Sequence, residues 1–191
     1  MTTAMTHLAP MKIAIVAPSP VPYVIGGAEN LWWGLLQALN QVPGIQAELI
    51  KLPSPERHLE EIINSYQQYA QLNLDHFDAV ITTKYPAWAI RHRRHVVYLQ
   101  HTLRGLYDTY RATATTVISA SDQARLRAYG VSEATLAALV AVATEGAPLC
   151  LDPETLPQVI AELQLAIQKD PKSTLWIFPG VVARAVVRLF D

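Results

Sequence analysis

The feature that most constrains this chain is a regular alternation of short apolar runs with longer segments of helical periodicity. The first run, KIAIVAP (12–18), is rich in β-branched residues and shows little polar alternation, as in strands buried on both faces of a parallel sheet. Three more runs with strand character follow: QAELIKL (46–52), DAVITT (78–83) and VVYLQ (96–100). Because parallel strands need crossover connections, the alternation predicts an α/β fold: a Rossmann-like parallel sheet with helices on both faces.

The segments between the first runs carry the spacing of amphipathic helices. From Glu29 onward, Leu31, Leu35 and Leu39 recur at i, i+4 and i+8, and Asn40, Pro43 and Gly44 provide the stop signal. Residues 56–74 place apolar side chains on one stripe and polar ones opposite, which predicts a second helix.

The second half of the chain predicts a helical C-terminal part. A short run, TVIS (116–119), suggests a fifth strand, and helical patterns cover 122–129, 133–143, 156–169 and 180–190. The last pattern runs to Asp191 without Gly, Asn or Pro, so the chain is expected to end inside an element. The apolar stripe of this helix, Val182, Val186 and Leu189, needs to be covered from water by another apolar surface.

Composition excludes several classes of protein. The chain has 191 residues, 51% of them hydrophobic and 16% charged, which excludes global disorder and suits one domain with its own core. A strongly basic nucleic-acid binder is disfavoured because 15 Lys and Arg meet 16 Asp and Glu. The single Cys150 cannot form an internal disulfide, and no apolar run approaches the roughly 20 residues of a membrane span, so we expect a cytoplasmic protein.

The Gly26–Gly27 pair lies between the first strand and the first helix. Two residues without Cβ allow a phosphate or sugar oxygen to approach the backbone N–H groups of a helix start, where the helix dipole favours an anion. Alternatively, the pair forms a tight turn, with Glu29 complementing the dipole. The segment is neither GxGxxG nor GxxxxGK[ST], so a dinucleotide dehydrogenase or a P-loop enzyme is poorly supported.

His101 directly follows the fourth predicted strand, and Thr83 and Lys84 end the third. Ligands of open α/β sheets bind beyond the carboxyl ends of the strands, where the strand order reverses. In the common order 3-2-1-4-5, strands one and four are neighbours, which would make His101 face Gly26 and Gly27 across a crevice with Thr83 and Lys84 on its rim. Alternatively, His101 is a structural hydrogen-bonding residue.

Basic residues concentrate in the middle of the chain. Between Lys84 and Arg127 there are eight basic residues against two acidic ones, Asp108 and Asp122. The simplest interpretation is a solvated face; the alternative is that Arg104 and its neighbours receive a nucleotide diphosphate or an anionic acceptor. The eight are Lys84, Arg91, Arg93, Arg94, Arg104, Arg111, Arg125 and Arg127.

These motifs together resemble one enzyme family. MKIAIVAPSPVPYVIGGAEN (11–30) resembles the start of GT-B glycosyltransferases of family 4: a strand, a proline-bearing loop and a Gly-Gly-Ala-Glu helix start. FDAVITTKYPAWAIRHRRHVVYLQHTLRGLYDTY (77–110) resembles the second signature of that group, in which a His ends the fourth strand. FPGVVARAVVRLFD (178–191) is similar to a helix late in the same domain.

The resemblance implies a metal-independent transferase that takes a hexosyl group from an NDP-sugar to a hydroxyl acceptor with retention of configuration. In such enzymes the N-terminal domain mainly holds the acceptor. By this resemblance, Gly26 and Gly27 approach the donor diphosphate, and His101 lies against the transferred sugar. The C-terminal domain supplies most nucleotide contacts, and no part of this sequence matches it.

We therefore expect residues 11–191 to form the acceptor-side domain of a truncated or split enzyme, after a flexible extension at 1–10, with little activity alone. The alternative is a non-catalytic subunit that binds a glycan or a lipid-linked acceptor, or that pairs with a separately encoded donor domain or a second copy. The stripe at Val182, Val186 and Leu189 motivates this alternative. A generic nucleotide-binding α/β domain is a third hypothesis. Peripheral membrane contact stays open; no metal and no nucleic acid are expected.

Overall fold

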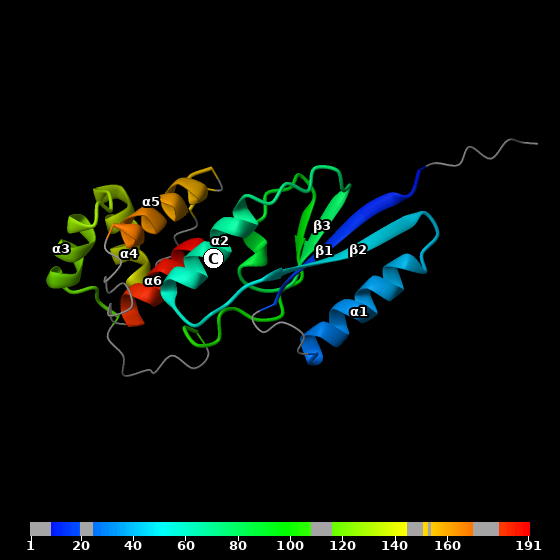
Figure 1. Ribbon diagram of the computed structural model, residues 1–191, viewed down its shortest axis with the longest axis horizontal. Helices are drawn as coiled ribbons and strands as arrows, with labels where there is room; N and C mark the ends of the chain where they lie inside the picture. Colours follow the sequence, from blue (N-terminus) through cyan, green and yellow to red (C-terminus); the bar gives the residue numbers. More distant parts are fainter. Residues whose placement is uncertain (1–8, 20–24, 108–115, 145–150, 153, 170–179) are drawn as a thin grey trace, which may run out of the picture.

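The computed structural model of the chain describes residues 9–19, 25–107, 116–144, 151–152, 154–169 and 180–191. Most of the extension predicted at 1–10 lies outside these residues. The described part is an α/β fold with one sheet of four parallel strands (Figure 1). The strands are β1 (Met11–Ser19), β2 (Ile45–Pro53), β3 (Ala79–Thr82) and β4 (His95–Val97). Each lies where an apolar run predicts a strand, which confirms the predicted fold class.

β1 is an inner strand of the sheet, between β2 and β3, and its side chains are buried continuously from Ile13 to Ser19. Ile15 pairs with Leu49 of β2 and with Ile81 of β3. An unbroken apolar run suits this position, because both faces of an inner parallel strand are covered. Past Val97, backbone pairing with the end of β3 continues as far as Gln100, whose N–H donates to the Thr83 carbonyl at 2.9 Å.

Helices cover both faces of the sheet. The β1-to-β2 and β2-to-β3 connections run in opposite directions across the sheet, so right-handed crossovers place their helices on opposite faces. These are α1 (Gly27–Asn40) and α2 (Leu59–Ala70), which lie on opposite sides of the strands in Figure 1. A short 3₁₀ turn, η1 (Ala87–Ala89), packs against α2 and connects β3 to β4.

The predicted strand order is wrong. The observed order is β2-β1-β3-β4, so β3 separates β1 from β4. The connection between β3 and β4 holds only η1 and short loops, and such a short connection leaves consecutive parallel strands adjacent.

The C-terminal part is helical, as predicted. It contains α3 (Ala120–Ala128), α4 (Glu133–Ala143), α5 (Leu156–Gln168) and α6 (Gly180–Phe190). α5 packs against α2, and α6 packs against α4 (Figure 1). Val182, Val186 and Leu189 are buried in the same core as the side chains of α2 and α4. The expectation that this stripe needs another chain to cover it is therefore wrong.

Two other boundaries differ from prediction. Residues 116–119 do not form a fifth strand: the Ser119 hydroxyl accepts a hydrogen bond from the Asp122 N–H and so caps α3, while Ile118 is buried. α2 begins at Leu59 rather than at residue 56. The Glu61 carboxylate accepts a hydrogen bond from the Arg57 N–H, and His58, the N-cap, has an extended backbone.

Near its start, the outer side of β2 is paired with a side chain at one residue, Ala47. Asn40, at the end of α1, donates from Nδ2 to the Ala47 carbonyl at 3.0 Å and accepts from the Ala47 N–H at 2.8 Å. A neighbouring strand would make the same two kinds of bond. The outer side of β4 pairs with no other strand within the part of the chain that the structure describes.

Candidate functional site

The strand order reverses between β1 and β3, and the predicted site residues divide around that point. The first connection from β1 leads outward to β2, and the chain then returns past β1 to β3. The carboxyl ends of such a strand pair border the crevice in which ligands of open α/β sheets bind. Gly26 and Gly27 follow β1, and Thr83 and Lys84 follow β3, so these four flank the crevice. His101 and Arg104 follow β4, one strand farther away.

Gly26 and Gly27 form the start of α1. Gly26 is the N-cap, with an extended backbone, and its N–H donates to Oε2 of Glu29 at 3.0 Å. The carboxylate of Glu29 therefore caps the helix, as expected from the alternative interpretation in which Gly26 and Gly27 form a tight turn. A Cβ at Gly27 would meet nothing within 4 Å, and its φ is not positive, so neither packing nor backbone conformation requires this glycine. An open space lies beside the first helical residue.

Lys84 is the most unusual charged residue of this region. It is only 6% exposed, and its Nζ lies 5.5 Å from the centre of the Trp32 ring. No carboxylate lies within ion-pair distance of it among the residues described. Burial lowers the pKa of Lys84; the charges of Glu56 and Glu29 oppose this shift, and that of Lys51 adds to it.

Lys51 brings a second ammonium group to the same ring. It lies near the end of β2, and its Nζ is 5.6 Å from the Trp32 ring centre. Trp32 belongs to α1 and is fully buried. Both cations are within the range of cation–π attraction. One lysine of β2 and one that follows β3 thus converge on one indole of α1.

Several buried polar atoms at this end of the sheet have no hydrogen-bond partner among the described residues. They are the indole Nε1 of Trp32, the hydroxyl of Thr83 and both amide atoms of Gln100. Thr83 and Gln100 are neighbours, since their backbones are hydrogen bonded. Buried polar groups are usually paired, and leaving one unpaired costs about 1–3 kcal/mol. Within the described part of the structure these buried atoms therefore remain unsatisfied.

His101 is half-buried at the far side of the crevice. Its Nδ1 donates to the Thr102 carbonyl at 2.8 Å, which in the neutral ring leaves the lone pair on Nε2. This geometry suits a ring that receives a hydrogen bond from a substrate hydroxyl. Arg104 is exposed, two residues after Thr102.

The basic segment predicted from the sequence is divided in space. Arg125 pairs with Asp122 at 3.4 Å, and Arg127 pairs with Glu133 at 2.6 Å, so both are neutralised within the helical part. Arg91, Arg93 and Arg94 are exposed in the loop before β4, at the opposite end of that strand from His101. Arg111 lies outside the described residues. Among the basic residues of this segment that the structure describes, Lys84 is the one that joins Lys51 at the Trp32 ring.

We call Lys51, Lys84, Trp32, Thr83 and Gln100 the lysine cluster. Three of these residues were not predicted as functional: Trp32, Lys51 and Gln100. Lys51 and Gln100 carried a usable signal, because each is a polar residue at the carboxyl end of a predicted strand. Trp32 carried none, since an aromatic residue within an apolar helix pattern predicts core packing. The two ammonium groups and the open helix start make this cluster chemically suited to a multiply charged anion.

Neither a metal centre nor a membrane span is found in the described part of the chain. No three His, Cys, Asp or Glu side chains there are grouped so that they could hold a metal ion. None of the described helices has the length and apolar character needed to cross a bilayer.

Compared with models of known protein families, with curated proteins and with solved structures, the chain shows no significant match. Membership of glycosyltransferase family 4 therefore stays a prediction from its motifs.

Proposed function

We propose that this chain is the acceptor-side domain of a retaining, NDP-sugar-dependent glycosyltransferase, and that its crevice receives the donor diphosphate. The observation that carries the proposal is Lys84, a buried ammonium without an ion-pair partner in the described structure, at the point where the strand order reverses. Burying an unpaired charge is costly, so such a charge usually has a partner. A diphosphate oxygen is a partner of the required sign.

The neighbours of Lys84 fit the same ligand. Lys51 supplies a second cation 5.6 Å from the shared Trp32 ring, and Gly27 leaves open space beside the helix start. In this proposal the two ammonium groups stabilise the negative charge that develops on the leaving diphosphate, which is an electrostatic contribution to catalysis. The carboxylate of Glu29, now on the Gly26 N–H, gives way to a phosphate oxygen.

In the same proposal His101 acts on the sugar side of the reaction. The lone pair on Nε2 of His101 accepts a hydrogen bond from a hydroxyl of the transferred sugar, while the Thr102 carbonyl holds the ring. Thr83, which is fully buried, keeps its hydroxyl unpaired among the described residues, and its backbone is hydrogen bonded to Gln100. Arg104, exposed at the outer side, adds positive charge on the approach to the crevice.

The test is the binding of UDP and GDP to the full chain, compared between wild type and Lys84→Met. Methionine keeps the length of the side chain and removes the charge. We expect the affinity for the preferred nucleotide, and for inorganic pyrophosphate, to fall at least tenfold, because a charge-assisted hydrogen bond contributes about 1.5–3 kcal/mol. The thermal midpoint should stay unchanged or rise, since an unpaired buried charge has been removed.

Lys12→Met is the matched control. Lys12 is exposed near the start of β1, at the opposite end of the strand from the crevice, and its loss changes the net charge equally. Nucleotide binding should be unaffected by this substitution. Equal affinities of wild type and Lys84→Met, or an equal loss in both variants, would show that Lys84 does not hold the diphosphate.

A further inference from the structure

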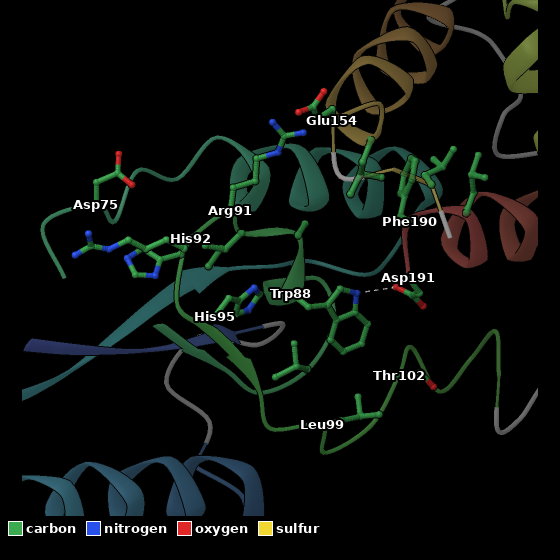
Figure 2. Close-up of a pocket in the computed structure, with 17 residues that line it drawn as sticks. Asp75, Trp88, Arg91, His92, His95, Leu99, Thr102, Glu154, Phe190 and Asp191 are labelled. Carbon is green, nitrogen blue, oxygen red and sulfur yellow. Dashed lines mark hydrogen bonds between the residues drawn. The ribbon is translucent and has the colours of Figure 1, made fainter. Parts of the chain in front are cut away.

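A cavity of about 870 Å³ lies on the η1 side of β4 (Figure 2), and neither Lys51, Lys84 nor Trp32 is among its lining residues. Its walls come from η1, from β4 and the residues that follow it, and from the ends of the C-terminal helices: Trp88, Val97, Leu99, Leu156 and Phe190 are among them. Volumes of this size are typical of sites for small organic ligands. Neither the diphosphate nor the transferred sugar of the proposed reaction accounts for it.

The middle of the cavity is apolar. Successive side chains of β4 point to opposite faces, so Val97 and Leu99 line the cavity, whereas Tyr98 points to the other face. Val97 is 46% exposed and Leu99 is 61% exposed. His95, on the same face, hydrogen bonds through Nε2 to the Thr82 hydroxyl at 2.8 Å, and burial, with a smaller contribution from His92, lowers its pKa. This ring is therefore uncharged near neutral pH.

The aromatic wall of the cavity is held in a fixed position. The indole N–H of Trp88 donates to the carboxylate of Asp191 at 3.1 Å, as the dashed line in Figure 2 shows. The same carboxylate accepts hydrogen bonds from the hydroxyls of Tyr66 and Tyr107. A ring that is fixed before a ligand arrives loses little entropy on binding.

Most of the charged groups that line the cavity lie at one end, and the carboxylate of Asp191 lies beside Trp88. Figure 2 shows Asp75, Arg91, His92 and Glu154 on the side away from Leu99, where charges of both signs occur. Beyond Leu99, the last lining residue is Thr102, whose backbone carbonyl holds the ring of His101. The apolar stretch therefore leads toward the residue proposed to contact the transferred sugar.

We propose that this cavity binds the apolar body of the acceptor, an alcohol whose hydroxyl lies at the Thr102 end beside His101. The assignment as acceptor rests on the proposed transferase function; the apolar ligand class rests on the cavity alone. The ligand places an alkyl or ring portion between Trp88 and Leu99 and keeps its polar head at the crevice. Binding is driven by removal of this apolar surface from water.

The probes are alkyl β-D-glucopyranosides, titrated into the full chain below their micelle concentration and followed by calorimetry. Octyl glucoside should bind, and methyl glucoside, with the same polar head, should not. From hexyl to octyl, each added methylene should tighten binding by up to about fourfold, as expected when it becomes fully buried. Equal affinities for the methyl and octyl compounds would overturn the proposal.

The matched variants are Leu99→Glu and Tyr98→Glu, which change adjacent exposed residues on opposite faces of the chain. Leu99→Glu should weaken octyl glucoside at least tenfold, because it places a charge in the apolar stretch, and Tyr98→Glu should bind like wild type. Binding that survives in Leu99→Glu, or is lost equally in both variants while both remain folded by circular dichroism, would place the ligand elsewhere.

The two proposals fail separately. If wild type and Lys84→Met bind nucleotide equally while octyl glucoside still binds, the transferase function and the assignment of the ligand as an acceptor are overturned. An apolar ligand site then remains. If octyl glucoside does not bind while Lys84→Met weakens nucleotide binding, the cavity proposal is overturned and the diphosphate site is retained.

Discussion

At the scale of single residues, Asp191 makes the most demanding set of contacts. Its carboxylate accepts hydrogen bonds from Trp88 Nε1 at 3.1 Å, from the Tyr107 hydroxyl at 2.8 Å and from the Tyr66 hydroxyl. Burial raises the pKa of Asp191 to about 6, although all three donors act to lower it. Nothing in the sequence predicts this cluster, because its donors are 84 to 125 residues away along the chain.

This carboxyl should make the stability of the protein depend on pH. Its pKa in the folded state lies above the reference value of 3.8, so the folded chain binds the proton first. The contribution of Asp191 to the free energy of unfolding therefore rises as the pH falls from about 7 to about 4. In Asp191→Asn this contribution is absent. As the pH falls from about 7 to about 4, the Tm of wild type minus the Tm of Asp191→Asn should therefore increase.

Tyr107→Phe provides an independent check on the same group. The hydrogen bond from Tyr107 lowers the pKa of Asp191, so its removal should move the pH-dependent stabilisation to higher pH. A difference between wild type and Asp191→Asn that stays constant with pH would mean that this carboxyl does not titrate in the expected range.

At the scale of elements, prediction succeeded where the sequence carries a local stop signal. Gly44 and Gly130 both have positive φ and both follow the end of a predicted helix. The limits of α4 match prediction, because the Ser132 hydroxyl caps it by accepting from the Thr135 N–H. The Ser119 hydroxyl caps α3 in the same way, but there the apolar run at 116–119 favoured a strand, which was the wrong element.

Two glycines should respond oppositely to alanine. Gly130 has φ +90°, and a Cβ there would lie 2.6 Å from Nζ of Lys169, so Gly130→Ala should lower the free energy of unfolding by about 1 kcal/mol. Gly34 lies inside α1, where an added Cβ would meet nothing within 4 Å, so Gly34→Ala should raise it by about 0.5–1 kcal/mol. Urea unfolding measures both changes, and changes of the same sign would contradict this account.

At the scale of the whole molecule, local patterns predicted the layers but not their arrangement. The apolar run of β1 identifies an inner parallel strand, yet it carries no information about which strands lie beside it. The error has a consequence for the site: the strand beside β1 is followed by Thr83 and Lys84, whereas His101 follows β4, one strand farther away. Likewise, the stripe of α6 shows that a face must be buried, whereas only the tertiary structure shows that this chain itself buries it.

The side-chain amide of Asn40 makes the two borders of the sheet unequal. At the β2 border, the backbone groups of Ala47 already have partners, so an added strand would have to displace Asn40 and break two hydrogen bonds. At the β4 border no described strand would have to be displaced. The two borders of the sheet therefore differ: a side chain already occupies the β2 border at Ala47, whereas the β4 border adjoins the apolar cavity.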